Sequence, residues 1–158
     1  MHESVMEYVG MIVERYGLAG MNVLEIGSYN VNGSVRPLFN GPYTGIDHCE
    51  GPGVDAVMEA NHLNFVDDTF DVVVSTSQLE HDPYFWETLP EVARVLRPGG
   101  YFILCTVSTG FGIHNEPDYW RFLPDTWPIL MKLADCEMID SRRDPQIGDG
   151  PQLTGIRR

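Results

Sequence analysis

The sequence predicts an α/β fold built on a doubly wound, mostly parallel sheet, with residues 1–158 forming a single domain. Two short apolar runs carry this prediction, because residues 23–26 end at Gly27 and residues 43–47 end in an acid. Such runs between turn residues are typical of strands buried on both faces. A third apolar run covers residues 70–76, and a chain of this length suits one domain.

Residues 3–16 are the first expected element, an amphipathic helix. Apolar side chains recur there at helical spacing, and the charged side chains lie elsewhere. These apolar residues are Val5, Val9, Ile12, Val13 and Tyr16. We expect Ser4 to cap the helix and Gly17 to end it.

The next part of the chain predicts three strands with little helix between them. The expected elements are a strand at 22–27, a short helix at 33–40 interrupted by Pro37, and strands at 43–47 and 54–58. Only residues 48–53 separate the second and third strands. Parallel neighbours usually need a crossover of about a dozen residues or more. The helix between strands two and three should therefore be missing.

The second half of the chain predicts an alternation of strands and helices that closes the sheet. The expected elements are a strand at 70–76, a helix at 84–96, a strand at 101–107, a long loop at 108–123, a helix at 125–134 and strands at 137–143 and 152–157. Pro90 should kink or restart the helix that contains it. The final strand should run antiparallel to its neighbours.

Composition narrows the class of protein. With 43% hydrophobic and 21% charged residues, the chain is typical of globular proteins. No apolar run approaches the roughly 20 residues of a membrane span, and the N-terminus does not resemble a signal peptide. Cys49, Cys105 and Cys136 are odd in number and lack CxxC spacing, which favours a reducing cytoplasm.

The net charge of −13 bears on possible partners. It opposes binding to a phosphate backbone, which needs clustered Lys and Arg, and so argues against nucleic acid as a substrate. Residues 1–79 contain 11 acids against Arg15 and Arg36. That excess suits a cationic ligand, although a solubilising surface explains it equally well.

The strand ends at Gly27 and Asp47 predict a nucleoside site. In an α/β fold, a glycine lets the loop approach the ligand, and an acid after the next strand accepts hydrogen bonds from ribose hydroxyls. The G-x-G-x-x-G spacing of dinucleotide sites is absent, since Gly27 and Gly33 are six residues apart. Glu25 would repel a phosphate but suits an ammonium or sulfonium group.

These motifs, in this order, resemble the class I S-adenosylmethionine-dependent methyltransferases. Glu25-x-Gly27 resembles motif I of that family, and further segments match in order: Asp47, Glu59-Ala60, the strand 70–76, Leu79-Glu80-His81 and 94–100. The segment 114–122 resembles a loop of a small-molecule, type 11-like branch. The resemblance implies a Rossmann-like fold, S-adenosylmethionine as the methyl donor and S-adenosylhomocysteine as its product.

The resemblance also implies a set of cofactor-binding residues. Asp47 would bind the ribose, Glu59 and Ala60 would meet the adenine, and Glu25 would hold the methionine ammonium. An acid within an apolar run could instead pair with a structural Arg or amide, and His48 suits either stacking on adenine or a solvated loop. The full set is Glu25, Gly27, Ser28, Tyr29, Asn32, Gly33, Asp47, His48, Glu59, Ala60 and Ser77.

Two histidines are candidates for a general base. His81 follows the strand at 70–76, and His114 lies on the long loop. An unperturbed histidine titrates near neutrality, as a base at neutral pH requires. His81 equally suits an interface position that anchors the start of a helix.

The loop at 108–123 contributes candidate acceptor-binding residues. Tyr119 and Trp120 suit an apolar wall, and Arg121 suits a clamp on a carboxylate or phosphate. Alternatively, the aromatic residues cover the sheet edge and Arg121 stacks on them. No metal site is expected, because close ligand spacing such as HExxH is absent. The residues considered for one are Glu80, His81, Asp82, His114 and Glu116.

Together these features predict in-line transfer of a methyl group to an oxygen, nitrogen or carbon nucleophile of a small-molecule acceptor. The alternative is a non-catalytic methyltransferase-like module that supports a partner. A compact chain has little room for a substrate-recognition insert, which a homodimer or a partner subunit would supply. A nicotinamide-dependent oxidoreductase is disfavoured because its glycine fingerprint is absent.

Overall fold

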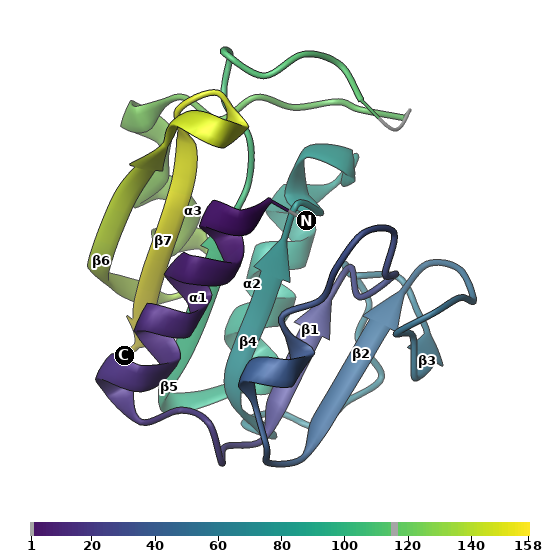
Figure 1. Cartoon of the computed structure of the whole chain (residues 1–158). Helices are drawn as coiled ribbons and strands as arrows, with labels where there is room; N and C mark the ends of the chain where they lie inside the picture. The colour runs from purple at the N-terminus through teal and green to yellow at the C-terminus, as the bar shows by residue number, and fades with distance from the viewer. Residues whose placement is uncertain (1, 115–116) are drawn as a thin grey trace.

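The computed structural model describes residues 2–114 and 117–158, which form a seven-stranded sheet (Figure 1). The strand order is β3-β2-β1-β4-β5-β7-β6. The strands are β1 Val23–Ile26, β2 Tyr43–Asp47, β3 Ala56–Val57, β4 Phe70–Thr76, β5 Leu96–Cys105, β6 Cys136–Asp144 and β7 Gly150–Arg157. The final strand β7 runs antiparallel to both β5 and β6, and β3, β2, β1, β4 and β5 pair in parallel. The predicted doubly wound, mostly parallel sheet is confirmed.

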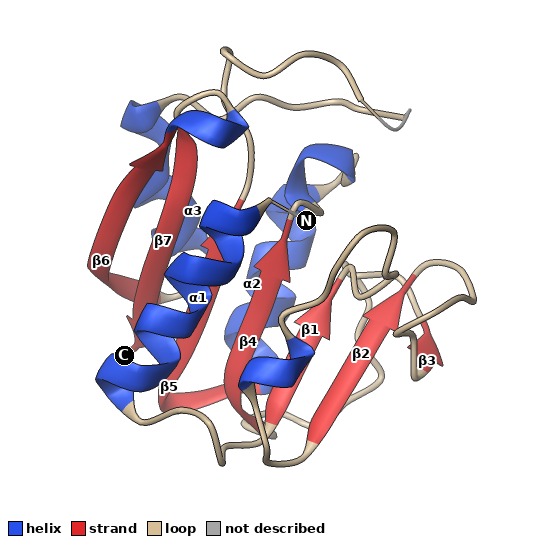
Figure 2. Ribbon diagram, viewed as in Figure 1, coloured by secondary structure: helices blue, strands red, loops and turns tan. Residues whose placement is uncertain are grey.

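Helices cover both faces of this sheet (Figure 2). Helix α1 (Glu3–Tyr16) packs on one face, and α2 (Phe85–Val95) and α3 (Trp127–Leu133) pack on the other. Short 3-10 turns occur at η1 Arg36–Leu38, η2 Leu79–His81, η3 Pro124–Thr126 and η4 Pro145–Ile147. Two hydrophobic cores result, one on each side of the sheet.

Strands β1 and β4 lie in the middle of the sheet, and their side chains therefore pack into both hydrophobic cores. Val72 and Val74 face the α1 core, and Val73 between them joins the α2–α3 core. All four residues of β1 are buried. This two-sided burial explains why the strands read as near-continuous apolar runs.

The connection between β2 and β3 lacks a helix, as the sequence predicted. The described residues 48–55 contain turns and bends but no helix. The expected strand at 54–58 shrinks to two residues, because the Asp55 side chain turns back to accept a hydrogen bond from the Gly45 amide at 2.7 Å. The expected helix at 33–40 is reduced to η1, whose first turn contains Pro37.

Two further expectations about element ends differ from the structure. Ser4 does not cap α1, because its hydroxyl donates to Asp144 Oδ2 at 2.6 Å and so ties the helix to the end of β6. Gly17 ends α1 in the left-handed conformation, as predicted. Strand β5 begins at Leu96, before the Pro98-Gly-Gly100 segment, because a register shift lets Leu96 pair with Phe70.

Pro90 lies inside α2 without ending it. The apolar positions Leu89 and Val92 are fully or almost fully buried against the core, and this packing holds the helix through the proline. The expected restart of the helix at Pro90 is therefore wrong.

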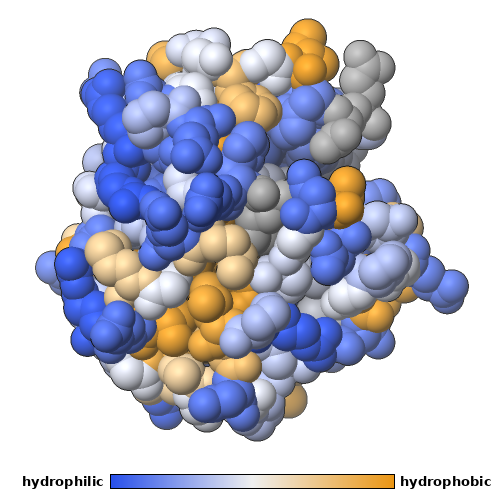
Figure 3. Space-filling model, in the orientation of Figure 1, coloured by the Kyte–Doolittle hydropathy of each residue, from blue (hydrophilic) through white to orange (hydrophobic). Residues whose placement is uncertain are grey.

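The outer surface is largely hydrophilic on the side that α1 covers, with apolar atoms showing between α1 and η1 (Figure 3). Partly buried side chains such as Met11 and Leu38 pack against the core on this side. Among the described helices, none combines the length and apolarity needed to cross a membrane.

Candidate active site

A cavity of about 750 Å³ opens where β1, β2 and β4 end. The carboxyl ends of parallel strands are where α/β folds bind ligands. The cavity is lined by Ile26, Gly27, Tyr29, Val31, Ile46, Asp47, His48, Cys49, Met58, Glu59, Ala60, Asn61, Ser77, Gln78, His81, Asp82, Pro83, Tyr84, Pro117 and Tyr119. Nine of the candidate residues from the sequence thus line one cavity: Gly27, Tyr29, Asp47, His48, Glu59, Ala60, Ser77, His81 and Tyr119.

Gly27 forms part of the cavity wall in a conformation that few other residues adopt. Its φ is +80°, and an added Cβ would lie 2.5 Å from Gln78 Cβ. Ser77 also has a positive φ of 54°, and its amide donates to the Cys105 carbonyl at 2.8 Å. Strained backbone of this kind is frequent at binding sites because the surroundings hold it in place.

Asp47 is fixed at the carboxyl end of β2. Its Oδ2 accepts a hydrogen bond from the Tyr29 amide at 3.1 Å, and its Oδ1 lies 2.8 Å from His48 Nδ1. The Asp47 side chain is only 9% exposed, whereas that of His48 is 76% exposed. These contacts join the glycine loop to the acid, so both candidate elements border the cavity as one unit.

Glu25 lies behind the cavity rather than among the residues that line it. It is 3% exposed, and its Oε2 accepts a hydrogen bond from the Tyr43 hydroxyl at 2.9 Å. Burial raises the pKa of Glu25 to about 7, although the bond from Tyr43 and the nearby Arg36 oppose this. Any effect of Glu25 on a bound ammonium must therefore act through water or through its field.

Three other loop candidates also lie outside the cavity lining. Ser28 is buried, and its Oγ has no hydrogen-bond partner among the described residues. Asn32 and Gly33 are exposed, and the Gly33 amide donates to Asn30 Oδ1 at 2.8 Å. These contacts shape the loop beneath Tyr29 and Val31, which do line the cavity.

His81 and His114 come together at the other end of the cavity, around a buried carboxylate. Their ring centroids are 5.1 Å apart, and Glu80 Oε1 lies 4.0 Å from His81 Nε2 and 3.9 Å from His114 Nε2. Burial raises the pKa of Glu80, and both histidines oppose that shift. His81 lines the cavity, whereas His114 lies behind it.

Arg121 is engaged within the long loop. Both oxygens of Asp118 accept its guanidinium hydrogens at 2.6 Å, and the carbonyls of Phe111, Gly112 and Trp120 accept the rest. All five N–H donors of the side chain are thus used. Arg121 holds the pKa of Asp118 below its usual value. The geometry assigns Arg121 to folding the loop, with no donor left over for a substrate.

The two aromatic candidates beside Arg121 differ in their positions. Tyr119 is 50% exposed and lines the cavity. Trp120 instead packs against Phe85 and Trp86, and its indole N–H donates to the Asp82 carbonyl at 2.8 Å. Tyr119 therefore suits contact with a ligand, and Trp120 covers α2.

Sequence reasoning missed several residues that line the cavity, namely Met58, Asn61, Gln78 and Tyr84. Met58, Asn61 and Gln78 follow the end of a strand within four residues, a position that could have indicated them, whereas Tyr84 precedes the first residue of α2. Of the residues considered for a metal site, Asp82 accepts from the Tyr84 amide and the Thr88 hydroxyl at 2.8 and 2.6 Å. Glu116 lies outside the described residues.

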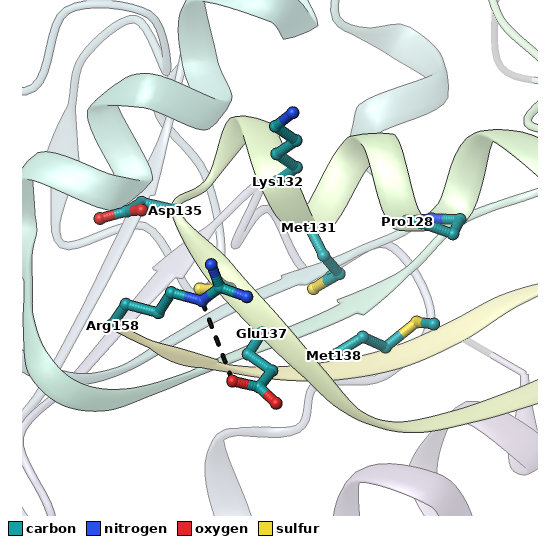
Figure 4. Close-up of a pocket in the computed structure, with 8 residues that line it drawn as sticks. Pro128, Met131, Lys132, Asp135, Glu137, Met138 and Arg158 are labelled. Atoms are coloured by element: carbon teal, nitrogen blue, oxygen red, sulfur yellow. Dashed lines mark ion pairs between the residues drawn. The ribbon is translucent and has the colours of Figure 1, made fainter.

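A second, smaller hollow of about 410 Å³ lies between α3 and β6 (Figure 4). Met131 and Met138 are among its lining residues, and Glu137 pairs with Arg158 at 3.9 Å. It adjoins the end of the antiparallel strand β7, so it lies at the opposite edge of the sheet from the strand ends around Gly27 and Asp47. None of the candidate site residues lines it.

Comparison with known proteins finds relatives in sequence and in fold. A family described as a methyltransferase domain matches residues 43–104. A phthiotriol/phenolphthiotriol dimycocerosates methyltransferase of Mycobacterium tuberculosis is 38% identical over 100 residues, covering 54% of this chain and 37% of that protein. A fatty-acid O-methyltransferase of Mycolicibacterium smegmatis is 34% identical over 127 residues, covering 71% of this chain and 45% of that protein. The chain thus spans less than half the length of these curated relatives.

Solved structures show the same fold. The Burkholderia thailandensis 1,6-didemethyltoxoflavin-N1-methyltransferase, crystallised with its acceptor and S-adenosylhomocysteine, superposes with a TM-score of 0.78. The two sequences are 20% identical, and the match covers 98% of this chain and 79% of that one. Motif order, relatives and fold agree with one another. The chain is thus similar in sequence to methyltransferases and has the fold of the class I S-adenosylmethionine-dependent methyltransferases.

Proposed function

We propose that this chain binds S-adenosylmethionine in the cavity and transfers a methyl group to a small-molecule acceptor. The main support for this proposal is the position of Asp47. It is the last residue of β2, and it lines the same cavity as Gly27. A carboxylate has about four lone-pair sites, so it can accept ribose hydroxyls in addition to its contacts with Tyr29 and His48. The relatives named for methyl transfer support the same activity.

The residues present fit a nucleoside with an amino-acid tail. Ile26, Ile46 and Met58 supply apolar surface for a base, and Glu59 and Asn61 supply polar groups for its edge. The cavity volume of about 750 Å³ lies within the usual range for small-ligand sites. The positions of Glu59 and Ala60 support their role beside the adenine, and the loop at Gly27–Tyr29 supports a role beneath the methionine.

The chain's own task in such a reaction is positioning. S-adenosylmethionine supplies an electrophilic methyl group on a sulfonium sulfur. The protein must hold the acceptor atom in line with that group, which lowers the barrier without a catalytic triad. When the acceptor must lose a proton, His81 is placed to take it because it lines the cavity, and His114 lies behind it with its ring centroid 5.1 Å from that of His81.

The rim of the cavity favours an apolar acceptor. Tyr29, Val31, Tyr84 and Tyr119 line it and are between 41% and 70% exposed. A mostly apolar lining with a few polar groups is typical of sites for small organic ligands. The net charge of −13 argues against nucleic acid as the acceptor. The three free cysteines support a reducing compartment such as the cytoplasm.

The shortage of helices around β2 and β3 supports a second candidate function. A methyltransferase-like module with this open side could support a partner subunit or a second copy of the chain, which would complete the walls of the cavity. The module would bind S-adenosylmethionine, or no ligand, and would not turn over alone. Formation of S-adenosylhomocysteine by the purified chain with a panel of fatty acids and phenols would exclude this candidate.

Calorimetric titration with S-adenosylmethionine and S-adenosylhomocysteine tests the proposed cofactor. We expect the wild-type chain to bind both, and Asp47→Asn to weaken both at least about tenfold, because hydrogen bonds to charged groups contribute about 1.5–3 kcal/mol. Glu50→Gln is the matched control, since it removes an exposed charge that lies outside the cavity lining. Failure of the wild-type chain to bind either ligand would refute the proposal.

A further inference from the structure

We propose that Glu80, His81 and His114 form a binding site for a divalent transition-metal ion at the acceptor end of the cavity. One carboxylate oxygen and two imidazole nitrogens are a common ligand set for Zn²⁺ and for related ions of the first transition series. The residues come from η2 and from the long loop, so only the folded chain brings them together.

The three potential ligand atoms already converge. One ligand atom from each residue lies within 4.8 Å of those of the other two. Glu80 Oε1 lies 4.0 Å from His81 Nε2 and 3.9 Å from His114 Nε2. Ligands about 2.0–2.2 Å from a tetrahedral ion are separated by roughly 3.3–3.5 Å. Forming the site would shorten the two Glu80–histidine distances by roughly 0.5 Å and the distance between the two histidine nitrogens by at most about 1.5 Å, and the partly exposed histidine side chains have room to move.

Glu80 and His81 are each oriented by a hydrogen bond on the side away from the proposed ion. The Thr106 hydroxyl donates to Glu80 Oε2 at 2.8 Å, which leaves Oε1 facing the histidines. His81 Nδ1 lies 2.7 Å from the Pro117 carbonyl oxygen, whereas His114 Nδ1 lies 3.5 Å from Asp118 Oδ2 and has no hydrogen-bond partner among the described residues. Histidines that bind metals usually donate one ring N–H to a carbonyl or carboxylate, which directs the other nitrogen to the ion.

The buried oxygen of Glu80 supplies independent support. The Glu80 side chain is 0% exposed, and its Oε1 has no hydrogen-bond partner among the described residues. A buried carboxylate oxygen without a partner is costly unless a cation or a donor reaches it. A metal ion bound between Oε1 and the two imidazoles would satisfy that oxygen.

The position of the site indicates what the ion would do. His81, Pro117 and Tyr119 line the cavity, so coordination positions left free by the protein would face the acceptor. An ion there would bind the acceptor oxygen and lower the pKa of its hydroxyl. The hydroxyl proton would leave to solvent, the oxygen would form the new C–O bond as the C–S bond breaks, and sulfur would keep that electron pair. This role rests on the proposed function, and it replaces the use of either histidine as a base.

Metal binding can be measured without turnover. The purified chain is stripped with a chelator and titrated with Co²⁺ and then with Zn²⁺, while visible absorption and bound metal are followed. We expect one equivalent, with Co²⁺ bands that Zn²⁺ abolishes. Glu80→Gln, His81→Ala and His114→Ala should each weaken binding at least about tenfold. His62→Ala removes an exposed histidine that lies elsewhere and should leave binding unchanged.

Clear outcomes would overturn the site. The proposal is refuted if the folded wild-type chain binds less than a stoichiometric amount of both ions, or if His62→Ala weakens binding as much as His81→Ala and His114→Ala do. Titrating S-adenosylmethionine into the same samples separates the two proposals. A wild-type chain that binds S-adenosylmethionine but neither metal ion overturns the metal site alone. The reverse result overturns the proposed function and leaves the metal site standing.

Discussion

Gly27 shows how one backbone position shapes the cofactor cavity. Its left-handed φ turns the chain at the end of β1, and the adjacent Gln78 side chain fills the space that a Cβ would need. The glycine therefore meets two demands, one conformational and one steric. Gly99 meets only the first, since its φ is +77° and no atom lies within 4 Å of an added Cβ.

This contrast predicts different outcomes for two alanine variants. Gly99→Ala should destabilise the chain by about 1–2 kcal/mol, the usual cost of a left-handed conformation. Gly27→Ala should cost more in urea unfolding and should also abolish S-adenosylmethionine binding, because Gln78 Cβ and Cγ at 2.5 and 2.6 Å must move into the cavity wall. Equal effects of the two substitutions would show that the contact with Gln78 is unimportant.

Glu25 makes stability depend on pH. Its pKa rises from 4.5 to about 7 in the folded chain, so the folded state holds this proton more tightly than the unfolded state does. The stabilising contribution is complete below about pH 4.5 and is lost as the pH rises through 7. The full change corresponds to about 3 kcal/mol.

Glu25→Gln should remove that dependence while it keeps an acceptor for the Tyr43 hydroxyl. We expect the free energy of unfolding of the wild-type chain to fall relative to the variant between pH 5 and pH 8. Urea unfolding of both proteins at the two pH values measures the difference, in which the other titrating groups cancel. A constant difference would mean that Glu25 titrates normally.

At the scale of elements, the loop that follows β5 is organised by its own charged pair. It extends across the carboxyl edge of the sheet (Figure 1) and returns to η2, where the Tyr119 and Trp120 amides donate to the Glu80 carbonyl at 2.8 and 3.1 Å. Asp118 accepts from Arg121 and from the His114 amide at 3.0 Å. One carboxylate thus positions both the loop and a site histidine.

Asp118→Asn should loosen this loop, because the amide loses both the charge and one acceptor oxygen. We expect trypsin to cleave after Arg121 at least about tenfold faster, with little change in the melting temperature, since loops open locally without global unfolding. Asp125→Asn removes an exposed acid nearby and serves as the control. Equal cleavage of the two variants would argue against the role of Asp118.

Elements with strong periodicity were predictable from the sequence, and their ends were less so. The apolar spacing of Val5, Val9 and Ile12 fixes the bounds of α1 as predicted. Ser4 was wrongly predicted as a helix cap because its hydroxyl bonds to Asp144, which is distant in sequence. Strand β5 begins earlier than predicted because Leu96 pairs with Phe70, which is also distant. Local sequence cannot reveal such partners, because they are determined by the packing of the whole sheet.

At the scale of the whole molecule, the same limit applies to the site. Gly27 and Asp47 were predictable because strand ends in an α/β sheet converge on one edge. The joining of Glu80 and His81 with His114 was not, because the long loop that brings His114 back has no regular pattern. The full engagement of Arg121 within its own loop was equally hidden.

The two outer strands of the sheet have a consequence for how molecules of this protein meet one another. On one side β3 is only two residues long, and on the other β6 has exposed charges such as Arg143 and a register shift between Met138 and Asp140. Short, charged or bulged borders discourage a neighbouring chain from adding a strand. Both edge strands therefore oppose the addition of further strands and the growth of fibrils. Concentrated solutions of the protein should not aggregate in this way, even though the centre of the sheet is highly apolar.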